Sequence, residues 1–317
     1  MYPGHLVDVP GFRVGHAQNR DWGTGVTVIL SPEGSTGGVD IRGGAPGSRE
    51  TDLLRPENQV SQVHAVVLSG GSAFGLESAS GVMNELAAQG IGLETGFAKV
   101  PIVCSAVLYD LGLGQVKWPD MAMGKEALFH ASSEDASQGN VGAGTGCSVG
   151  KIAGMDRAMK SGLGQASLRL GDLVVSCLVA VNAVGDIRDP ERANLPIAGL
   201  LGPNGELGST MDFLLDGERE ADLLGKNTTI GCIATNARLD KAGALKVCQM
   251  GHDGLARAIE PVHTLFDGDS LFCLASNQVD AEPNLVGILG AKVLQRAIVN
   301  AGESAEEAYG LKSHSSS

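Results

Sequence analysis

The chain has 317 residues, of which 23 are basic and 36 are acidic, and its formal net charge is −13. This acidic balance argues against a basic track for nucleic-acid phosphates and against binding to an anionic membrane surface. Hydrophobic residues make up 43% of the chain, which is enough to build a folded core. The 46 glycines are about twice the usual share of roughly 7%, so we expect many backbone turns.

The cysteines and the N-terminus favour a reduced, intracellular setting. The six cysteines form no CxxC pair and no Cys/His cluster, so neither a zinc site nor a disulfide framework is predicted. The first residues lack a basic segment followed by an apolar one, and no apolar run reaches the roughly 18 residues that span a bilayer. We therefore expect a soluble cytoplasmic protein with buried thiols and no metal. The cysteines are Cys104, Cys147, Cys177, Cys232, Cys248 and Cys273.

In the first half of the chain, short apolar runs alternate with helical patterns, which is typical of a mixed α/β domain. Residues 26–30 and 65–68 read as buried strands. Residues 72–88 predict a helix, because apolar side chains recur at helical spacing until Gly90 ends the run.

The second half of the chain continues this alternation. Apolar runs on both sides of Gly171-Asp172 predict a β-hairpin formed by residues 168–170 and 173–184. Two helices are expected further on, at residues 239–259 and 284–299, and Pro283 suits the first turn of the latter. The polar tail after Tyr309 is predicted to fray.

Residues 186–226 interrupt this rhythm with about forty residues that show no sustained period, which is uncommon inside a compact domain. The segment reads either as a linker between domains or as a covering loop that leads to a cleavage point. It ends at Asn227-Thr228-Thr229-Ile230, where small polar residues lead directly into a predicted buried strand.

Conventional catalytic motifs are missing from the sequence. There is no HExxH motif, no GxSxG elbow and no Cys/His pair typical of a thiol hydrolase. The glycine-rich run 142–151 looks like a phosphate loop but has Thr145 where a glycine is needed and Ile152 after the lysine. The run Gly-Gly-Ser-Ala-Phe-Gly at 70–75 lacks GxGxxG spacing, so nucleotide binding is disfavoured.

The junction between Asn227 and Thr228 suggests different chemistry. A threonine hydroxyl is a weak nucleophile that needs a base beside it. If the chain is cut before Thr228, the freed α-amine, with a pKa of roughly 7.7–8.0, can serve as that base. The hydroxyl can make the cut itself by attacking the preceding carbonyl. The dipeptide alone is weak evidence, because most Asn-Thr pairs are turns or caps.

A family resemblance extends over nearly the whole chain and strengthens this interpretation. The sequence resembles the self-processing N-terminal-nucleophile peptidase family of L-aminopeptidase/D-esterases, β-aminopeptidases and endo-type 6-aminohexanoate-oligomer (nylon) hydrolases. The motifs that carry the resemblance are VDIRGGAPG at 39–47, RETDLL at 49–54, HAVVLSGGSAFGLE at 64–77, VPIV at 100–103, AVLYD at 106–110, the run 142–151, Val181-Asn182 and NTTI at 227–230.

The resemblance implies how the chain is processed and where its nucleophile lies. Thr228 matches the nucleophile that becomes a new N-terminus after cleavage at Asn227-Thr228, which would give chains 1–227 and 228–317. Asn182 matches the amide that stabilises the oxyanion. Tyr109 matches a phenol near the nucleophile, either as a second donor or as a proton carrier.

The resemblance also implies three charged site residues. Lys151 matches an active-site lysine of the nylon hydrolases, where a cation would lower the pKa of the Thr228 amine. Asp267 and Asp269 match an acidic pair, and their i, i+2 spacing would put both side chains on one face of a strand. In the aminopeptidase branch these two positions are Ser and Glu, so the Asp pair favours the nylon-hydrolase branch.

Each of these residues also has a structural interpretation. Lys151 could be a solvated loop charge, and Tyr109-Asp110 could be a core aromatic and a cap. Asp267-Gly268-Asp269 reads equally well as a hairpin turn. We interpret His64 and His263 as satisfied core or turn histidines, because a threonine with its own amine needs no imidazole.

Taken with the resemblance, the sequence predicts a single hydrolase domain, 1–317, folded as a four-layer α/β/β/α sandwich. We expect a homotetramer of processed protomers without a metal or organic cofactor, hydrolysing linear amides of ω-amino acids through a Thr228 acyl-enzyme. One alternative is an aminopeptidase for short peptides with a free amine, including β-peptides or D-esters. The other is a non-catalytic binding protein of the same fold.

Overall fold

The computed structural model describes residues 3–217 and 227–316, which include a nine-stranded mixed sheet. The strand order is β10-β11-β14-β16-β2-β4-β7-β3, and β1 also pairs with β2. The strands are β1 (Arg13–Asn19), β2 (Thr24–Ile41), β3 (Ser48–Arg49), β4 (Gln62–Ser69), β7 (Val103–Val107), β10 (Leu163–Leu170), β11 (Leu173–Asn182), β14 (Thr228–Ala237) and β16 (Ser270–Val279).

The long strand β2 connects two halves of this sheet. Its first part pairs with β1 and β4, and its last part, from Thr36 to Ile41, pairs with β16. The register shifts between Leu30 and Ser35, which is where the strand passes from one half to the other.

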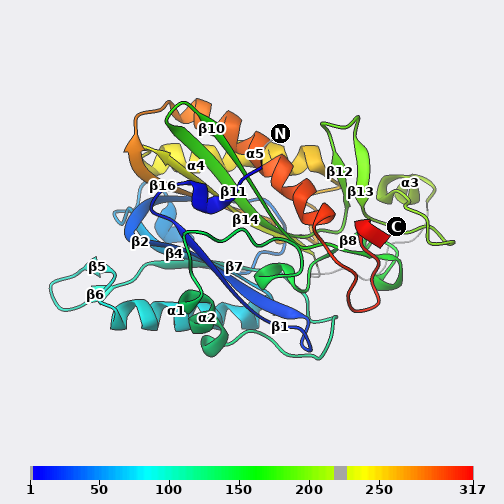
Figure 1. The fold of residues 1–317 in the computed structure, drawn as a ribbon, viewed down its shortest axis with the longest axis horizontal. Helices are drawn as coiled ribbons and strands as arrows, with labels where there is room; N and C mark the ends of the chain where they lie inside the picture. Colours follow the sequence, from blue (N-terminus) through cyan, green and yellow to red (C-terminus); the bar gives the residue numbers. More distant parts are fainter. Residues whose placement is uncertain (1–2, 218–226, 317) are drawn as a thin grey trace.

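The core consists of three apolar layers: one between the two halves of the sheet, and one between each half and its helices. Along β11, Val175, Cys177 and Val179 belong to the layer under α4 and α5. The alternate residues Val174 and Leu178 belong to a central layer shared with β4, β7 and β16. A third layer lies between α1, α2 and strands β1, β2 and β4. Figure 1 shows the two helix pairs on opposite sides of the strands, so the predicted four-layer α/β/β/α sandwich is confirmed.

The four main helices are α1 (Glu77–Ala88), α2 (Met121–Phe129), α4 (Lys241–Ala258) and α5 (Pro283–Glu303). Asp240 caps α4 by accepting from the Gly243 N–H, and Pro283 occupies the first turn of α5, as predicted. Within the described ranges, α5 is the one helix long and apolar enough to cross a membrane, but 67% of its most apolar window is buried inside the fold. It packs on α4, β10 and β11 as a core helix.

The stretch that the sequence left unassigned is partly ordered. Residues 186–217 contain β12 (Asp186–Asp189), β13 (Leu195–Ala198) and α3 (Thr210–Leu215), and β12 also pairs with β15 (Ile259–Glu260). The rest of it, 218–226, lies outside the described residues. The other short elements are β5 (Leu93–Glu94), β6 (Lys99–Val100), β8 (Ser148–Val149), β9 (Met159–Lys160) and six 3₁₀ turns at Leu6–Asp8, Asp52–Leu54, Ser72–Leu76, Gly142–Gly144, Met155–Arg157 and His314–Ser316.

The predicted fraying of the C-terminal tail is wrong. The Lys160 N–H donates to the Lys312 carbonyl oxygen at 2.7 Å, so the tail runs beside β9. Leu311 is buried against Leu113 and Ala158, and Ser313 is fully buried. These contacts are distant in sequence, and a local reading of a polar tail therefore misses them.

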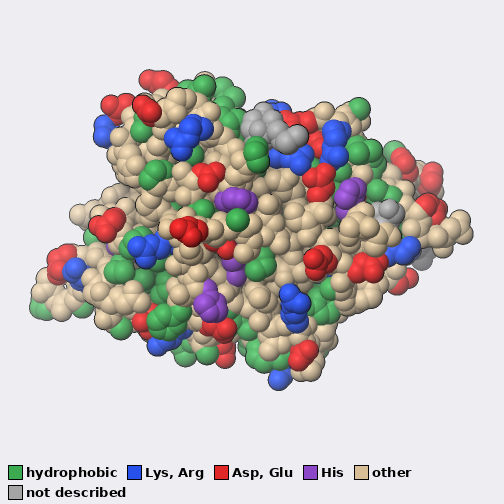
Figure 2. Space-filling view, viewed as in Figure 1, with side chains coloured by type: hydrophobic (Ala, Val, Ile, Leu, Met, Phe, Trp, Pro, Cys, Tyr) green, Lys and Arg blue, Asp and Glu red, His purple; other side chains and the backbone are tan. Residues whose placement is uncertain are grey.

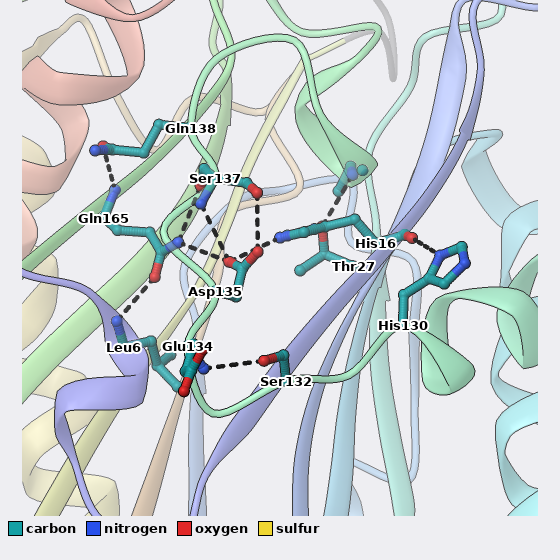
Figure 3. Close-up of polar contacts among 12 residues, drawn as sticks. Leu6, His16, Thr27, His130, Ser132, Glu134, Asp135, Ser137, Gln138 and Gln165 are labelled. Carbon is teal, nitrogen blue, oxygen red and sulfur yellow. Dashed lines mark hydrogen bonds and ion pairs between the residues drawn. The ribbon is translucent and has the colours of Figure 1, made fainter.

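A polar cluster around Asp135 anchors the start of the glycine-rich loop (Figure 3). His16 Nε2 and Gln165 Nε2 each lie 3.2 Å from Asp135 Oδ2. His16 Nδ1 lies 2.9 Å from the Thr27 hydroxyl, which in turn accepts from the Ala143 N–H at 3.0 Å. The cluster thus connects β1, β2 and β10 to the loop that leads to Lys151.

The surface agrees with the charge balance of the sequence. On the face drawn in Figure 2, acidic and basic side chains are interspersed, and no continuous basic region is seen. The six cysteines are free and buried, as predicted.

Candidate active site

Thr228 is the first residue of β14, a central strand of the sheet, and Asn227 precedes it in an intact peptide. Thr228 pairs with Asn182 of β11, and Asn227 pairs with Asp267 in a parallel bridge. Both residues are buried, with exposed fractions of 4% for Thr228 and 0% for Asn227. The junction is therefore held on both sides by backbone pairing.

The carbonyl oxygen of Asn227 accepts two hydrogen bonds. The Thr228 hydroxyl donates to it, and the Gly268 N–H donates to it at 3.0 Å. A donor to a carbonyl oxygen stabilises negative charge that develops on that oxygen when the carbonyl carbon is attacked. The geometry thus brings a hydroxyl and a polarising N–H to the same peptide group.

Asn182 and Lys151 form the polar wall beside this junction. The Lys151 ammonium donates to the Asn182 backbone oxygen and to Oδ1, both at 2.9 Å, and the Ser148 N–H donates to Oδ1 at 3.1 Å. Asn182 Nδ2 donates to the Tyr109 carbonyl oxygen at 2.8 Å. These bonds fix which end of the amide faces Lys151.

Burial controls the charges of the site. It lowers the pKa of Lys151 to about 7, although Cys147, Asp267 and Asp110 each favour the charged form. It also raises the pKa of Asp267 to about 6, and the neighbouring Asp269 adds to that shift. Both pKa values therefore lie close to neutral pH, a shift that is common among buried groups at functional sites.

The two aspartates do not lie on one face of a strand, so that part of the prediction is wrong. They precede β16, and each carboxylate has its own donors. Asp267 Oδ2 accepts from the Thr264 N–H at 2.9 Å and from its hydroxyl at 2.5 Å. Asp269 Oδ1 accepts from the Thr229 N–H at 2.7 Å. Both side chains are buried.

A cavity of about 210 Å³ opens beside Lys151. Burial raises the pKa of Asp110 in its wall to about 6, while donors from Thr24 and Gly71 favour the carboxylate. The cavity is lined by Tyr109, Asp110, Gly112, Leu113, Gly146, Ser148, Lys151 and Met155. Its apolar or small residues are Gly112, Leu113, Gly146 and Met155, and its polar side chains are those of Tyr109, Asp110, Ser148 and Lys151.

The structure brings the predicted residues to one place and adds others. Lys151 is buried, so the interpretation as a solvated loop charge is wrong. His64 accepts from the Ile102 N–H at 3.1 Å and is a satisfied core histidine, as predicted. His263, interpreted in the same way, lies on a loop and hydrogen bonds through Nδ1 to Asp269. Gly268 and Ser148 contribute backbone N–H groups, which no side-chain motif reveals.

Among residues 3–217 and 227–316, no group of three or more His, Cys, Asp or Glu side chains is arranged to hold a metal ion.

Comparison with solved structures identifies the fold. The fold is similar to that of the L-aminopeptidase D-Ala-esterase/amidase from Ochrobactrum anthropi, described as a variant of the Ntn hydrolase fold. The TM-score is 0.72, with 19% identity, over 96% of this chain and 87% of that chain. The protein therefore has the fold of an Ntn-hydrolase aminopeptidase.

The family follows from sequence comparison. The chain belongs to peptidase family S58, whose profile matches residues 4–316. It is 37% identical to the uncharacterized aminopeptidase Rv1333 of Mycobacterium tuberculosis, over 98% of this chain and 96% of that protein. It is 33% identical to the 6-aminohexanoate-oligomer endohydrolase of Agromyces sp., over 93% of this chain and 85% of that protein. The protein is thus a peptidase or amide hydrolase.

Proposed function

We propose that this protein cuts itself between Asn227 and Thr228 and then hydrolyses amides with Thr228 as its N-terminal nucleophile. The observation that carries the proposal is the Asn227 carbonyl oxygen, which accepts from both the Thr228 hydroxyl and the Gly268 N–H. This arrangement provides the attacking group and a stabilising donor for self-cleavage at one buried peptide.

The self-cleavage proceeds through an ester. The Thr228 hydroxyl oxygen attacks the Asn227 carbonyl carbon, the C–N bond breaks, and the Thr228 nitrogen takes the proton. Water then hydrolyses the ester, which leaves a carboxylate on Asn227 and a free amine on Thr228. Residues 1–227 and 228–317 become separate chains in this scheme.

In turnover, the freed amine acts as the base. It accepts the Thr228 hydroxyl proton while the oxygen attacks the substrate carbonyl carbon. The protonated amine then donates to the leaving nitrogen, and water hydrolyses the acyl-enzyme ester with the amine again as the base. Asn182 Nδ2 and the Tyr109 phenol are the proposed donors to the substrate oxyanion.

The charged residues tune that amine. A Lys151 cation disfavours a second positive charge nearby and keeps the Thr228 amine a free base. The backbone of Asp267 pairs with Asn227, and we assign its carboxyl to orienting the new amine, together with Asp269, which accepts from the Thr229 N–H. We expect processed protomers to assemble as a homotetramer in the cytoplasm, which light scattering on the purified protein and cell fractionation test.

The proposed substrates are linear amides of ω-amino acids, such as 6-aminohexanoate oligomers, cleaved within the chain. Leu113, Met155 and Gly112 give the cavity an apolar wall that suits a run of methylene groups. A relative whose name gives this substrate class is 33% identical to the chain.

A second candidate is an aminopeptidase for short peptides with a free amine. It is favoured by the Asp110 carboxyl in the cavity wall, which a substrate ammonium would pair with, and by the 37% identity to the mycobacterial aminopeptidase. Oligomers with free and with acylated amino termini distinguish the two candidates, because only the aminopeptidase loses all cleavage when the amine is blocked.

The self-cleavage is tested on a denaturing gel with intact-mass analysis of freshly purified protein. The proposal expects two fragments that meet at Asn227 and Thr228. One intact chain in fully active material would refute the threonine mechanism, and one intact, inactive chain would favour the non-catalytic binding protein.

A further inference from the structure

His263 lies on the loop between β15 and β16 and makes two hydrogen bonds to one carboxylate oxygen. Its ring Nδ1 lies 2.8 Å from Asp269 Oδ2, and its backbone N–H donates to the same oxygen at 3.1 Å. The other oxygen of Asp269 accepts from the Thr229 N–H at 2.7 Å. A continuous line of hydrogen bonds therefore runs from His263 to the residue that follows Thr228.

The hydrogen bond from the Thr229 N–H to Asp269 takes the place of a backbone hydrogen bond between β14 and β16. Pairing between β14 and β16 starts at Ile230 and Ser270, so the Thr229 N–H lies just before the regular ladder. The Asp269 side chain supplies the acceptor that a neighbouring strand would otherwise give. The start of β14, which carries Thr228, thus depends on the orientation of one buried carboxylate.

The His263 ring is itself held in place. It meets His252 of α4 edge to face, with ring centroids 4.7 Å apart, and its side chain is 18% exposed. His252 Nε2 in turn lies 3.1 Å from the Asp40 carbonyl oxygen. The backbone of His263 has φ +59°, a left-handed conformation that is uncommon for residues other than glycine, although asparagine, aspartate and histidine adopt it more often than the rest. This conformation lets the N–H and the ring reach the same oxygen.

We propose that His263 is a positioning residue for Thr228, which rests on the proposed function above. Two donors on Asp269 Oδ2 prevent the carboxylate from rotating, so that Oδ1 stays on the Thr229 N–H. Without the ring donor the carboxylate can turn, and the Thr228 hydroxyl loses its alignment with the Asn227 carbonyl. Small errors in the placement of a nucleophile are costly to rate.

Two substitutions separate the ring donor from the backbone conformation. His263→Gly accepts the positive φ but removes the donor. His263→Asn also accepts the positive φ and keeps a side-chain N–H close to the position of Nδ1. Ala193→Gly is the matched control, because Ala193 also has a positive φ, of +53°, on an exposed loop between β12 and β13.

The measured quantity is the rate of self-cleavage of the freshly synthesised chain at Asn227-Thr228, which needs no external substrate. We expect His263→Gly to slow this rate by about 10- to 100-fold. His263→Asn should restore it to within about threefold of the wild-type rate, and Ala193→Gly should leave it unchanged. Thermal melts show whether each variant is folded. If His263→Gly does not fold, the self-cleavage rate of His263→Asn alone decides whether the role of His263 stands.

Two results would overturn the role of His263. One is a folded His263→Gly variant that cleaves itself as fast as the wild type. The other is a folded His263→Asn variant whose self-cleavage is at least tenfold slower than that of the wild type. A wild-type chain that never cleaves itself would instead refute the proposed function, and the inference with it.

Discussion

Gly268 lies close to the Thr228 hydroxyl, and this approach gives a sharp test of the self-cleavage geometry. A Cβ at this position would lie 2.8 Å from the Thr228 hydroxyl oxygen and 2.9 Å from the Ala45 carbonyl oxygen. Carbon–oxygen contacts normally begin at about 3.3 Å. Because the carbonyl belongs to the backbone, we expect the hydroxyl to move by about 0.5 Å in Gly268→Ala.

A displacement of 1 Å at a reacting group can cost about 100-fold in rate, so half of that predicts a loss of about tenfold. The rate of fragment formation, followed by intact mass, measures the loss directly. Gly290→Ala on α5 is the control, since its added methyl meets only side-chain carbons, the nearest at 3.2 Å. A folded Gly268→Ala that matures at the wild-type rate would refute the placement of the Thr228 hydroxyl against Asn227.

Three further substitutions test the other groups. Thr228→Ala should remain a single inactive chain by intact mass; if it is processed normally, Thr229 becomes the candidate nucleophile. Lys151→Met should raise the pKa of the Thr228 amine and move the acidic limb of kcat/KM to higher pH by about one unit, and an unchanged pH profile would exclude the lysine from that role. Burial lowers the pKa of Lys160 to about 8 from 10.5, so between these values this lysine binds more protons in the unfolded chain, and its own contribution to wild-type stability rises with pH there. Lys160→Met should lack this rise, on the order of 3 kcal/mol, in melting curves compared across that pH range; an equal slope in both proteins would contradict it.

Elements with a strong local pattern could be predicted from the sequence. The hairpin around Gly171-Asp172 forms with Leu170 opposite Leu173, because its turn and its flanking apolar residues are adjacent in the chain. The strand predicted at 26–30 covers only the first part of β2. The rest of the strand is not recognisable from the sequence, because Gly37 and Gly38 resemble a turn. An added Cβ at Gly38 would lie 2.6 Å from the backbone of Ala244. Gly38 thus allows close packing under α4, which no local pattern reveals.

The candidate site could be predicted only in part. Thr228, Asn182 and Lys151 were named from motifs, and they do lie together around the start of β14. The environment of Asp269 was predicted incorrectly, because it is set by contacts with a segment distant in the sequence. Asn227 pairs with Asp267, and the Thr229 N–H donates to the Asp269 carboxylate. The contact between His263 and Asp269 could not be predicted for the same reason: it depends on a left-handed backbone at His263 that the sequence does not specify.

The position of Thr228 in the sheet bears on why cleavage there would be compatible with a stable fold. β14 lies between β11, which precedes the junction, and β16, which follows it. β16 in turn pairs with β2, and α5 packs on β10 and β11. Residues from both sides of Asn227 therefore share each of the two apolar layers that contact β14. A cut before Thr228 would free one amine at the end of a strand without exposing either layer, so the base required for catalysis could appear in a scaffold that is already rigid.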